Sequence, residues 1–290
     1  MKKAACIILL ILVAGIVLWL TAYRPVLPEQ VAAFAVDAAL KVRGDFGGNF
    51  QIIDPGRWEP ALPGLEIRTL RLGREKDLAS FKLQAVRVSP SEFAIEVIRL
   101  TPKESSRMRP AEIMASRNAL ALINGPFFDH MEQSLGLLVI DGRVINKKPR
   151  RGADAIFFVK DGRPRIATRE DFPHTDVDFA IQTGPWLVRD GARIEGFQRP
   201  WLVDRRSALG LDAQGRLLLA VTDAAINGLS LYELSHLLAR PESGGGLGCV
   251  DAVNLDGGTS TQMMLSAGDA RIRVRGFKRV PVFLLVVKKR

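Results

Sequence analysis

The longest unbroken hydrophobic stretch of the chain lies at its N-terminus. Lys2 and Lys3 precede an apolar run over residues 4–20, whose length suits a short membrane-spanning helix and slightly exceeds the core of a usual signal peptide. Positive charge before the run predicts export of the rest of the chain. Residues 20–22 lack a small residue where cleavage would need one, so residues 1–23 are predicted to be a signal anchor in preference to a cleaved signal peptide. The body is then expected on the periplasmic face of the cytoplasmic membrane.

Between residues 24 and 56 the pattern is mixed, and we expect a linker with one short helix followed by a Gly- and Pro-rich passage. From residue 57 to residue 290 short apolar runs alternate with turn signals, which predicts a single β-rich domain. Three Asp-Gly pairs lie between apolar runs and predict type I′ hairpin turns, because both central residues of that turn need positive φ. These pairs are Asp141-Gly142, Asp161-Gly162 and Asp190-Gly191.

Further apolar runs predict additional strands. The runs at 81–88 and 93–100 predict a strand pair around the turn 89–92. A longer turn at 212–215 is expected to join two more strands. Residues 282–287 are continuously apolar and predict a last strand that is buried on both faces.

Two segments carry helix signals. Pro110 stands at a tolerated first-turn position of a helix that ends near Arg117. Ser230 and Glu233 form a capping box that opens a second helix. Many hairpins and few helices predict an α+β fold, a twisted mixed or antiparallel β-sheet flanked by a few helices, rather than a doubly wound nucleotide-binding fold.

Composition narrows the function classes. The net charge is +10, which favours polyanionic neighbours such as nucleic acid, anionic lipid or phosphorylated glycan. Two cysteines and three histidines are too few for a zinc cluster or a disulfide framework. The chain also lacks a His-Glu-x-x-His motif, a Gly-x-Ser-x-Gly elbow and a Ser-x-x-Lys motif, which disfavours zincin proteases and the common serine hydrolases.

Polar residues gather after apolar runs, most clearly at 254–261. Asn254 and Asp256 are two positions apart, so on a strand they would point to the same side. Gly257 and Gly258 remove side-chain bulk beside them, and Ser260 adds a hydroxyl. A tight hairpin would need only one Asp-Gly pair and would leave Asn254 unexplained. Asp256 is therefore a candidate acid, base or nucleophile.

Other run ends supply further candidates, each of which also has a plainer explanation as a turn, a kink or a solvated side chain. An arginine at a strand entrance suits a phosphate through paired hydrogen bonds. The candidates are Asn124, Gly125, Thr183, Gly184, Arg206 and Asp223.

Five ordered motifs together resemble the phosphodiester glycosidase family. They are Asn-Gly-x-Phe-Phe at 124–128, Gln-Thr-Gly-Pro at 182–185, Arg-Ser-Ala-Leu-Gly at 206–210, Gly-Leu-Ser-Leu-Tyr-Glu-Leu at 228–234 and Asn-Leu-Asp-Gly-Gly at 254–258. Pro126 and Thr259 stand where the family usually has glycine. The resemblance implies hydrolysis of a sugar-1-phosphodiester at the anomeric carbon.

The resemblance also implies roles for the candidates. Asp256 would be the carboxylate and Arg206 the phosphate clamp, while Asp223 would support Arg206 or act as a second acid or base. Asn124 and Asn254 would orient sugar hydroxyls. The remaining candidates would line the substrate site, namely Gly125, Thr183, Gly184, Gly257, Gly258 and Ser260. A divalent metal among Asp223, Asn254 and Asp256 is compatible with these residue types, although their spacing does not require one.

Two other functions fit parts of the sequence. A non-catalytic envelope module that binds phosphorylated glycan, peptidoglycan or lipid headgroups would keep the basic surface but would not need Asp256. Nucleic-acid binding is a weaker alternative, because several basic residues lie at the termini and the basic cluster at 147–151 is expected to be a solvated loop. No basic strand interleaved with aromatic residues supports base stacking.

Overall fold

The computed structural model describes residues 50–74, 80–150, 152–197, 202–225 and 228–289. They belong to one compact unit that spans residues 46–290. The predicted signal anchor, the short helix expected at 31–43 and most of the predicted linker lie outside the described residues. Within the described ranges, no helix combines the length and the apolar character that a bilayer-spanning segment needs.

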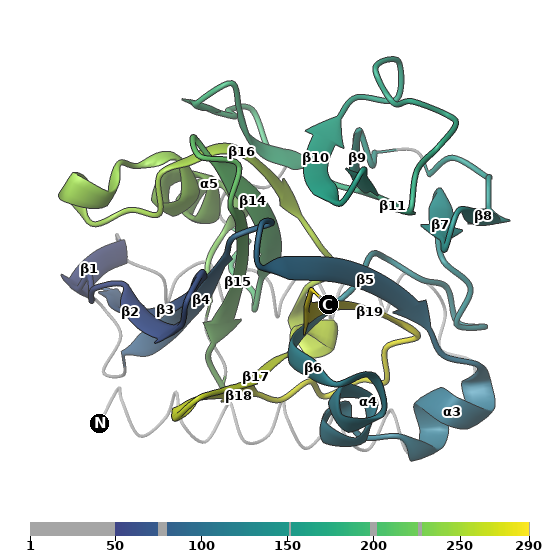
Figure 1. Ribbon diagram of the computed structural model, residues 1–290. Coiled ribbons are helices and arrows are strands. Elements are labelled where there is room, and N and C mark those ends of the chain that lie inside the picture. Colours follow the sequence, from purple (N-terminus) through teal and green to yellow (C-terminus); the bar gives the residue numbers. More distant parts are fainter. Residues whose placement is uncertain (1–49, 75–79, 151, 198–201, 226–227, 290) are drawn as a thin grey trace, which may run out of the picture. The chain divides into compact units, whose positions relative to one another are not determined.

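Antiparallel β-sheets dominate this unit (Figure 1). The largest sheet has the order β1-β3-β4-β15-β14-β16-β12-β13, with β2 paired to β3. Its strands are β1 (Phe50–Asp54), β2 (Glu59–Leu62), β3 (Leu65–Arg74), β4 (Phe81–Val88), β12 (Trp186–Arg189), β13 (Ala192–Arg193), β14 (Ser207–Asp212), β15 (Leu217–Asp223) and β16 (Cys249–Asn254).

Two five-stranded sheets complete the β-structure. One has the order β10-β9-β11-β7-β8 and consists of β7 (Leu138–Ile140), β8 (Arg143–Asn146), β9 (Ala155–Lys160), β10 (Arg163–Ala167) and β11 (Phe179–Thr183). The other has the order β18-β17-β6-β19-β5 and consists of β5 (Phe93–Arg99), β6 (Ala119–Asn124), β17 (Met263–Ala267), β18 (Ala270–Val274) and β19 (Val282–Lys288).

Helices are few and short. They are α3 (Pro102–Arg107), α4 (Pro110–Arg117) and α5 (Leu231–Ala239), with 3-10 turns η1 (Glu242–Gly244) and η2 (Gly258–Ser260). Helix α4 contacts β6 (Figure 1). Helix α5 contacts β12 and β16. The prediction of a β-sheet fold with few helices is confirmed, and every pairing between the described strands is antiparallel rather than mixed.

The locally encoded elements are confirmed. Asp and Gly have positive φ in all three Asp-Gly turns, which join β7 to β8, β9 to β10 and β12 to β13. The turn at 212–215 joins β14 to β15. The capping box of α5 also forms, because the Ser230 hydroxyl accepts from the Glu233 amide and the Glu233 carboxylate accepts from the Ser230 amide.

Two expectations about connection are not met. The runs at 81–88 and 93–100 do form β4 and β5, but the predicted pairing between them is wrong. Strand β4 pairs with β3 and β15, whereas β5 pairs with β19 in a different sheet. Both strands are largely buried, so each needs partners that the short intervening turn does not determine. In addition, the segment expected to be a linker contains β1, which pairs with β3.

One hydrophobic core takes side chains from all three sheets, including Phe93 of β5, Phe157 of β9 and Leu209 of β14. A second cluster lies between the largest sheet and α5, where Leu83 and Leu237 are fully buried. The burial of apolar faces against both cores is the main stabilising contribution to such a fold.

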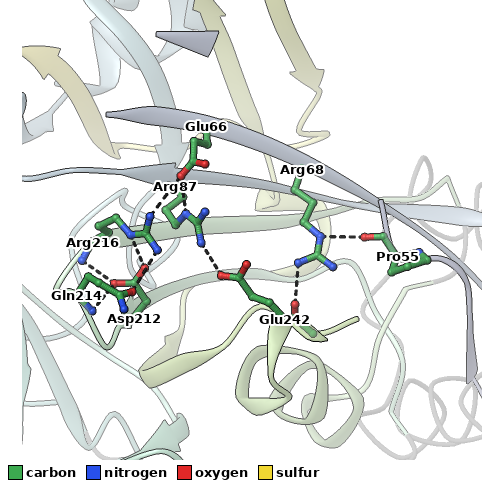
Figure 2. Close-up of polar contacts among 9 residues, drawn as sticks. Pro55, Glu66, Arg68, Arg87, Asp212, Gln214, Arg216 and Glu242 are labelled. Carbon is green, nitrogen blue, oxygen red and sulfur yellow. Dashed lines mark hydrogen bonds and ion pairs between the residues drawn. The ribbon is translucent and has the colours of Figure 1, made fainter. Parts of the chain in front are cut away.

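A group of ion pairs fastens the N-terminal strands to η1 (Figure 2). Arg87 on β4 donates from Nε to Glu66 Oε2 at 2.8 Å and from Nη1 to Glu242 Oε1 at 2.5 Å. Its guanidinium also lies 4.2 Å from the ring centroid of Trp58. Burial alone would lower the pKa of Arg87, but Glu66 and Glu242 together raise it above its ordinary value.

Arg68 on β3 makes a second connection in the same region. Its guanidinium donates to the carbonyl oxygens of Pro55 at 2.9 Å and Gly246 at 2.8 Å (Figure 2). The side chain is almost fully buried, and that burial lowers its pKa. Arg68 thereby hydrogen-bonds two segments that are distant in sequence to strand β3, one before β2 and one after α5.

Candidate active site

Asp256 lies just after the end of β16, next to the end of β6. Its amide approaches the Gly125 carbonyl oxygen at 3.4 Å, and its own carbonyl oxygen accepts from Asn124 Nδ2 at 2.8 Å. The Asp256 carboxylate accepts from the Gly257 amide at 3.0 Å. The main chain of Asp256 therefore joins the motif at 124–128 to the motif at 254–258, although the two are more than 100 residues apart in the sequence.

The Asn124 amide is fully engaged within the protein. Its Oδ1 accepts from the Ser207 hydroxyl at 2.7 Å and from the Gln262 amide at 3.1 Å, while Nδ2 donates to Asp256 and to Gly125. The side chain is completely buried. These contacts hold Asp256 in place, and the role of Asn124 in orienting a sugar hydroxyl stays a prediction.

Asn254 joins the end of β16 to the end of β11. Its Nδ2 donates to the carbonyl oxygens of Gly184 at 3.2 Å and Leu255 at 2.7 Å. Its own carbonyl oxygen accepts from the Thr183 hydroxyl at 2.6 Å and from the Gly184 amide at 3.1 Å. The Asn254 Oδ1 atom is buried without a hydrogen-bond partner, whereas most buried acceptors in folded proteins have one.

The glycines near Asp256 make room for the chain itself. A Cβ atom on Gly125 would lie 2.7 Å from the Val282 carbonyl oxygen, and one on Gly257 would lie 2.9 Å from the Arg205 carbonyl oxygen. Gly258 has a φ of +60° at the start of η2, a conformation that L side chains rarely adopt. These close approaches pack the end of β6 against the start of β19 and the 256–260 turn against the segment that enters β14.

The structure gives Arg206 a different environment from that of Asp256. Its Nε donates to the Leu229 carbonyl oxygen at 2.8 Å and its Nη2 to the Leu202 carbonyl oxygen at 2.7 Å. Burial lowers its pKa, and the carboxylates that oppose this effect are Asp204 and Glu233. Two donors of the predicted phosphate clamp are therefore used by the main chain, and the clamp role stays a prediction.

Asp223 is exposed at the end of β15. Its charge acts on Arg205, a buried residue whose pKa burial lowers. Arg205 donates from Nη2 to the Arg275 carbonyl oxygen at 2.7 Å, and its guanidinium lies 4.7 Å from the ring centroid of Phe277. The predicted roles of Asp223, as support for Arg206 or as a second acid or base, stay predictions.

Electrostatics at Asp256 combine burial with nearby positive charge. Burial raises the pKa of the Asp256 carboxyl group, because the charged form is less well solvated. Hydrogen bonds from Ser260 and Gly257 and the charges of Lys278 and Arg150 act in the opposite direction. Ser260 itself is buried in η2. The predicted carboxylate thus lies in a partly desolvated position on which the charges of Lys278 and Arg150 act.

Arg150 and Lys278 are site residues that sequence reasoning missed. Arg150 had been assigned to a solvated basic loop, but its guanidinium lies 3.6 Å from the ring centroid of Phe127. Lys278 Nζ lies 4.5 Å from the ring centroid of Phe128. The available signal was the pair of phenylalanines in the Asn-Gly-x-Phe-Phe motif, since exposed aromatic faces attract cations.

Comparison with known proteins places the chain in a family. The phosphodiester glycosidase profile matches residues 117–287, more than half of the 290-residue chain. The chain belongs to the phosphodiester glycosidase family. The span matched by this family contains every site residue predicted from the sequence. No curated protein sequence matches the chain.

Solved structures share the fold of this phosphodiester glycosidase domain. The catalytic domain of zebrafish N-acetylglucosamine-1-phosphodiester alpha-N-acetylglucosaminidase, auto-inhibited by its pro-peptide, is 20% identical with a TM-score of 0.57, over 83% of this chain and 88% of that one. A hypothetical protein from Synechocystis is 14% identical with a TM-score of 0.54, over 81% of this chain and 64% of that one. At these identities the likeness is one of fold.

A metal site is not evident in the part of the chain that the structure describes. There, no three His, Cys, Asp or Glu side chains are grouped closely enough to hold a metal ion. A divalent metal among Asp223, Asn254 and Asp256 stays a prediction from the residue types.

Proposed function

We propose that the protein hydrolyses a sugar-1-phosphodiester at the anomeric carbon, with Asp256 as the acting carboxylate. The observation that carries this proposal is the position of Asp256, whose desolvated carboxylate is held by Gly257 and Ser260 beside the charges of Arg150 and Lys278. Membership of the phosphodiester glycosidase family supports the reaction class. The name of the zebrafish relative supports a phosphodiester of N-acetylglucosamine as the first substrate to test.

The chemistry suits these residues. The bond between the anomeric carbon and the phosphate oxygen breaks, its electron pair leaves with the phosphate, and water supplies the hydroxyl group and the proton of the products. A phosphomonoester has a second pKa of about 6, so it leaves without much help from a general acid. The carboxylate then either activates water or meets the oxocarbenium-like centre, as in the two usual glycosidase mechanisms.

We also propose that the protein is exported and held at the membrane. The support is the apolar run at 4–20 behind Lys2 and Lys3, as argued above. Labelling an introduced cysteine in the 57–290 domain of intact cells with a membrane-impermeant reagent would test this. Labelling only after lysis would contradict export.

The decisive experiment offers the purified protein a panel of sugar-1-phosphodiesters in ¹⁸O-labelled water. Incorporation of the label into the sugar is expected, because cleavage occurs on the carbon side of the bridging oxygen. Asp256→Asn should lower turnover by at least about 10³-fold, the scale expected for loss of a catalytic group. Label in the phosphate product, or full turnover by the variant, would contradict the proposal.

Asp251→Asn is the matched control. Asp251 lies on β16, is also partly buried, and has a pKa that burial raises, but its carboxylate accepts from the Asp190 amide away from the site. Its variant should retain turnover. Binding of the phosphodiester without any cleavage by the wild-type protein would instead support the non-catalytic envelope module.

A further inference from the structure

Two cations of the site rest on phenylalanines that are adjacent in sequence. Phe127 lies under the Arg150 guanidinium and Phe128 under the Lys278 ammonium group. Both positive charges act on the Asp256 carboxylate. An aromatic face positions a cation without neutralising its charge, so both cations keep their attraction for an anionic ligand.

The Arg150 guanidinium has a donor that the protein does not use. Its Nη1 atom is buried and has no hydrogen-bond partner. None of the ion pairs among the described residues includes Arg150, although the charge of Asp256 acts on it. A buried donor without a partner is costly, and a rotation of the guanidinium toward a ligand acceptor would remove that cost.

The main chain of Arg150 is fixed by one buried side chain. Gln182 at the end of β11 accepts from the Arg150 amide at 3.2 Å and donates to the Arg150 carbonyl oxygen at 3.3 Å. The same side chain donates to the Ala153 carbonyl oxygen at 2.7 Å and accepts from the Leu137 amide at 3.1 Å. The loop that carries Arg150 is thereby held in one conformation, and such preorganisation lowers the entropic cost of binding a ligand.

We propose that Arg150, assisted by Lys278, binds the phosphate group of the substrate. This inference rests on the proposed function for the nature of the anion, and it gives Arg150 the role that the sequence suggested for Arg206. A guanidinium offers paired N–H groups to phosphate oxygens, and the lysine adds a point charge. As the bond to the anomeric carbon breaks, the phosphate gains a second negative charge, so both cations also stabilise the leaving group.

Isothermal titration calorimetry of the purified full chain with inorganic phosphate and with N-acetyl-α-glucosamine 1-phosphate tests this proposal. Arg150→Gln is expected to weaken both affinities by about tenfold or more, and Arg150→Lys by a smaller factor because charge remains but the paired donors do not. Lys147→Gln removes one charge from an exposed position of the same loop and should leave both affinities within about twofold.

The results separate this inference from the proposed hydrolysis. Absence of phosphate binding by the wild-type chain, or equal binding by Arg150→Gln and Lys147→Gln, overturns the role of Arg150 even if phosphodiesters are cleaved. Loss of binding in Arg150→Gln supports it even if no phosphodiester is cleaved, in which case the hydrolase proposal fails alone. Circular dichroism verifies that each variant is folded. If Arg150→Gln does not fold, the phosphate affinity of Arg150→Lys decides whether Arg150 binds the phosphate.

Discussion

At the scale of single residues, the pKa of the Asp256 carboxyl group results from opposing effects. Burial disfavours its ionised form, while Ser260, Gly257, Lys278 and Arg150 favour it, and the balance leaves its pKa above the ordinary value. A carboxylate in this state is a stronger base than an exposed aspartate. The same contacts that fix the side chain therefore set the pH range in which it can act.

This balance predicts the acid limb of the pH–rate profile. With Asp256 acting in its ionised form, kcat/KM should rise with pH through a value above about 3.9, the ordinary pKa of aspartate. Arg150→Gln removes a charge that favours the ionised form, so the limb should move to higher pH. Profiles of wild type, Arg150→Gln and Lys147→Gln check this; a limb that moves to lower pH in Arg150→Gln contradicts it.

Gly125 allows a test of tight main-chain packing beside the site. Gly125→Ala would place Cβ 2.7 Å from the Val282 carbonyl oxygen, and we expect a loss of about 1–3 kcal/mol in the free energy of unfolding. In Gly73→Ala the nearest atom is Cδ1 of Ile53, at 2.8 Å, the end of an exposed side chain that can move. Urea denaturation should show little loss for Gly73→Ala; equal losses would refute the argument.

At the scale of elements, the ion pairs around Arg87 connect strands to a 3-10 turn. Arg87 is 5% exposed, and the side chains of its partners Glu66 and Glu242 are 28% and 43% exposed. Partial solvation of the carboxylates weakens each pair relative to a fully buried one. The cluster therefore contributes mainly by fixing where β3, β4 and η1 meet.

Replacing Arg87 tests this connection. Arg87→Gln leaves two carboxylates without their shared cation and removes the contact with Trp58, so we expect a loss of about 2 kcal/mol in unfolding free energy. Arg189→Gln is the control, because Arg189 is 48% exposed and 3.7 Å from the exposed Asp190. Its loss should stay below about 0.5 kcal/mol. Indistinguishable urea midpoints for the two variants would contradict the prediction.

At the scale of the whole molecule, the folded unit extends beyond the span that the family shares. The family match begins at residue 117, but β4 pairs with β15 and β5 with β19. Both strands also supply the common core, for example Val86 and Phe93. The segment before residue 117 is therefore part of the same cooperative structure.

Fragments of the chain test this dependence. Residues 117–290 alone would expose the apolar surface that β3, β4 and β5 cover, and we expect no cooperative thermal transition from that fragment. Residues 46–290, the compact unit, should unfold cooperatively by differential scanning calorimetry. A cooperative transition in the shorter fragment would show that β1–β5 are dispensable.

Sequence reasoning succeeded where structure is encoded locally. The Asp-Gly turns and the capping box at Ser230 and Glu233 each depend on a few adjacent residues. The prediction of the partner of β4 was wrong because its true partner β15 lies more than 100 residues away. The sequences of two buried strands do not indicate that they pair with each other. Arg150 was missed for the same reason, since its position depends on Phe127 and on Gln182.

The adjacent residues Gln182 and Thr183 have a mechanical consequence. Gln182 holds the loop of Arg150, the proposed phosphate ligand, and the Thr183 hydroxyl holds the strand end that leads to Asp256, the proposed catalytic carboxylate. The loop of Arg150 and the strand end before Asp256 are thus anchored to the same terminus of β11. A displacement of that terminus would shift both segments in concert, so a substitution at either anchor is expected to disturb both.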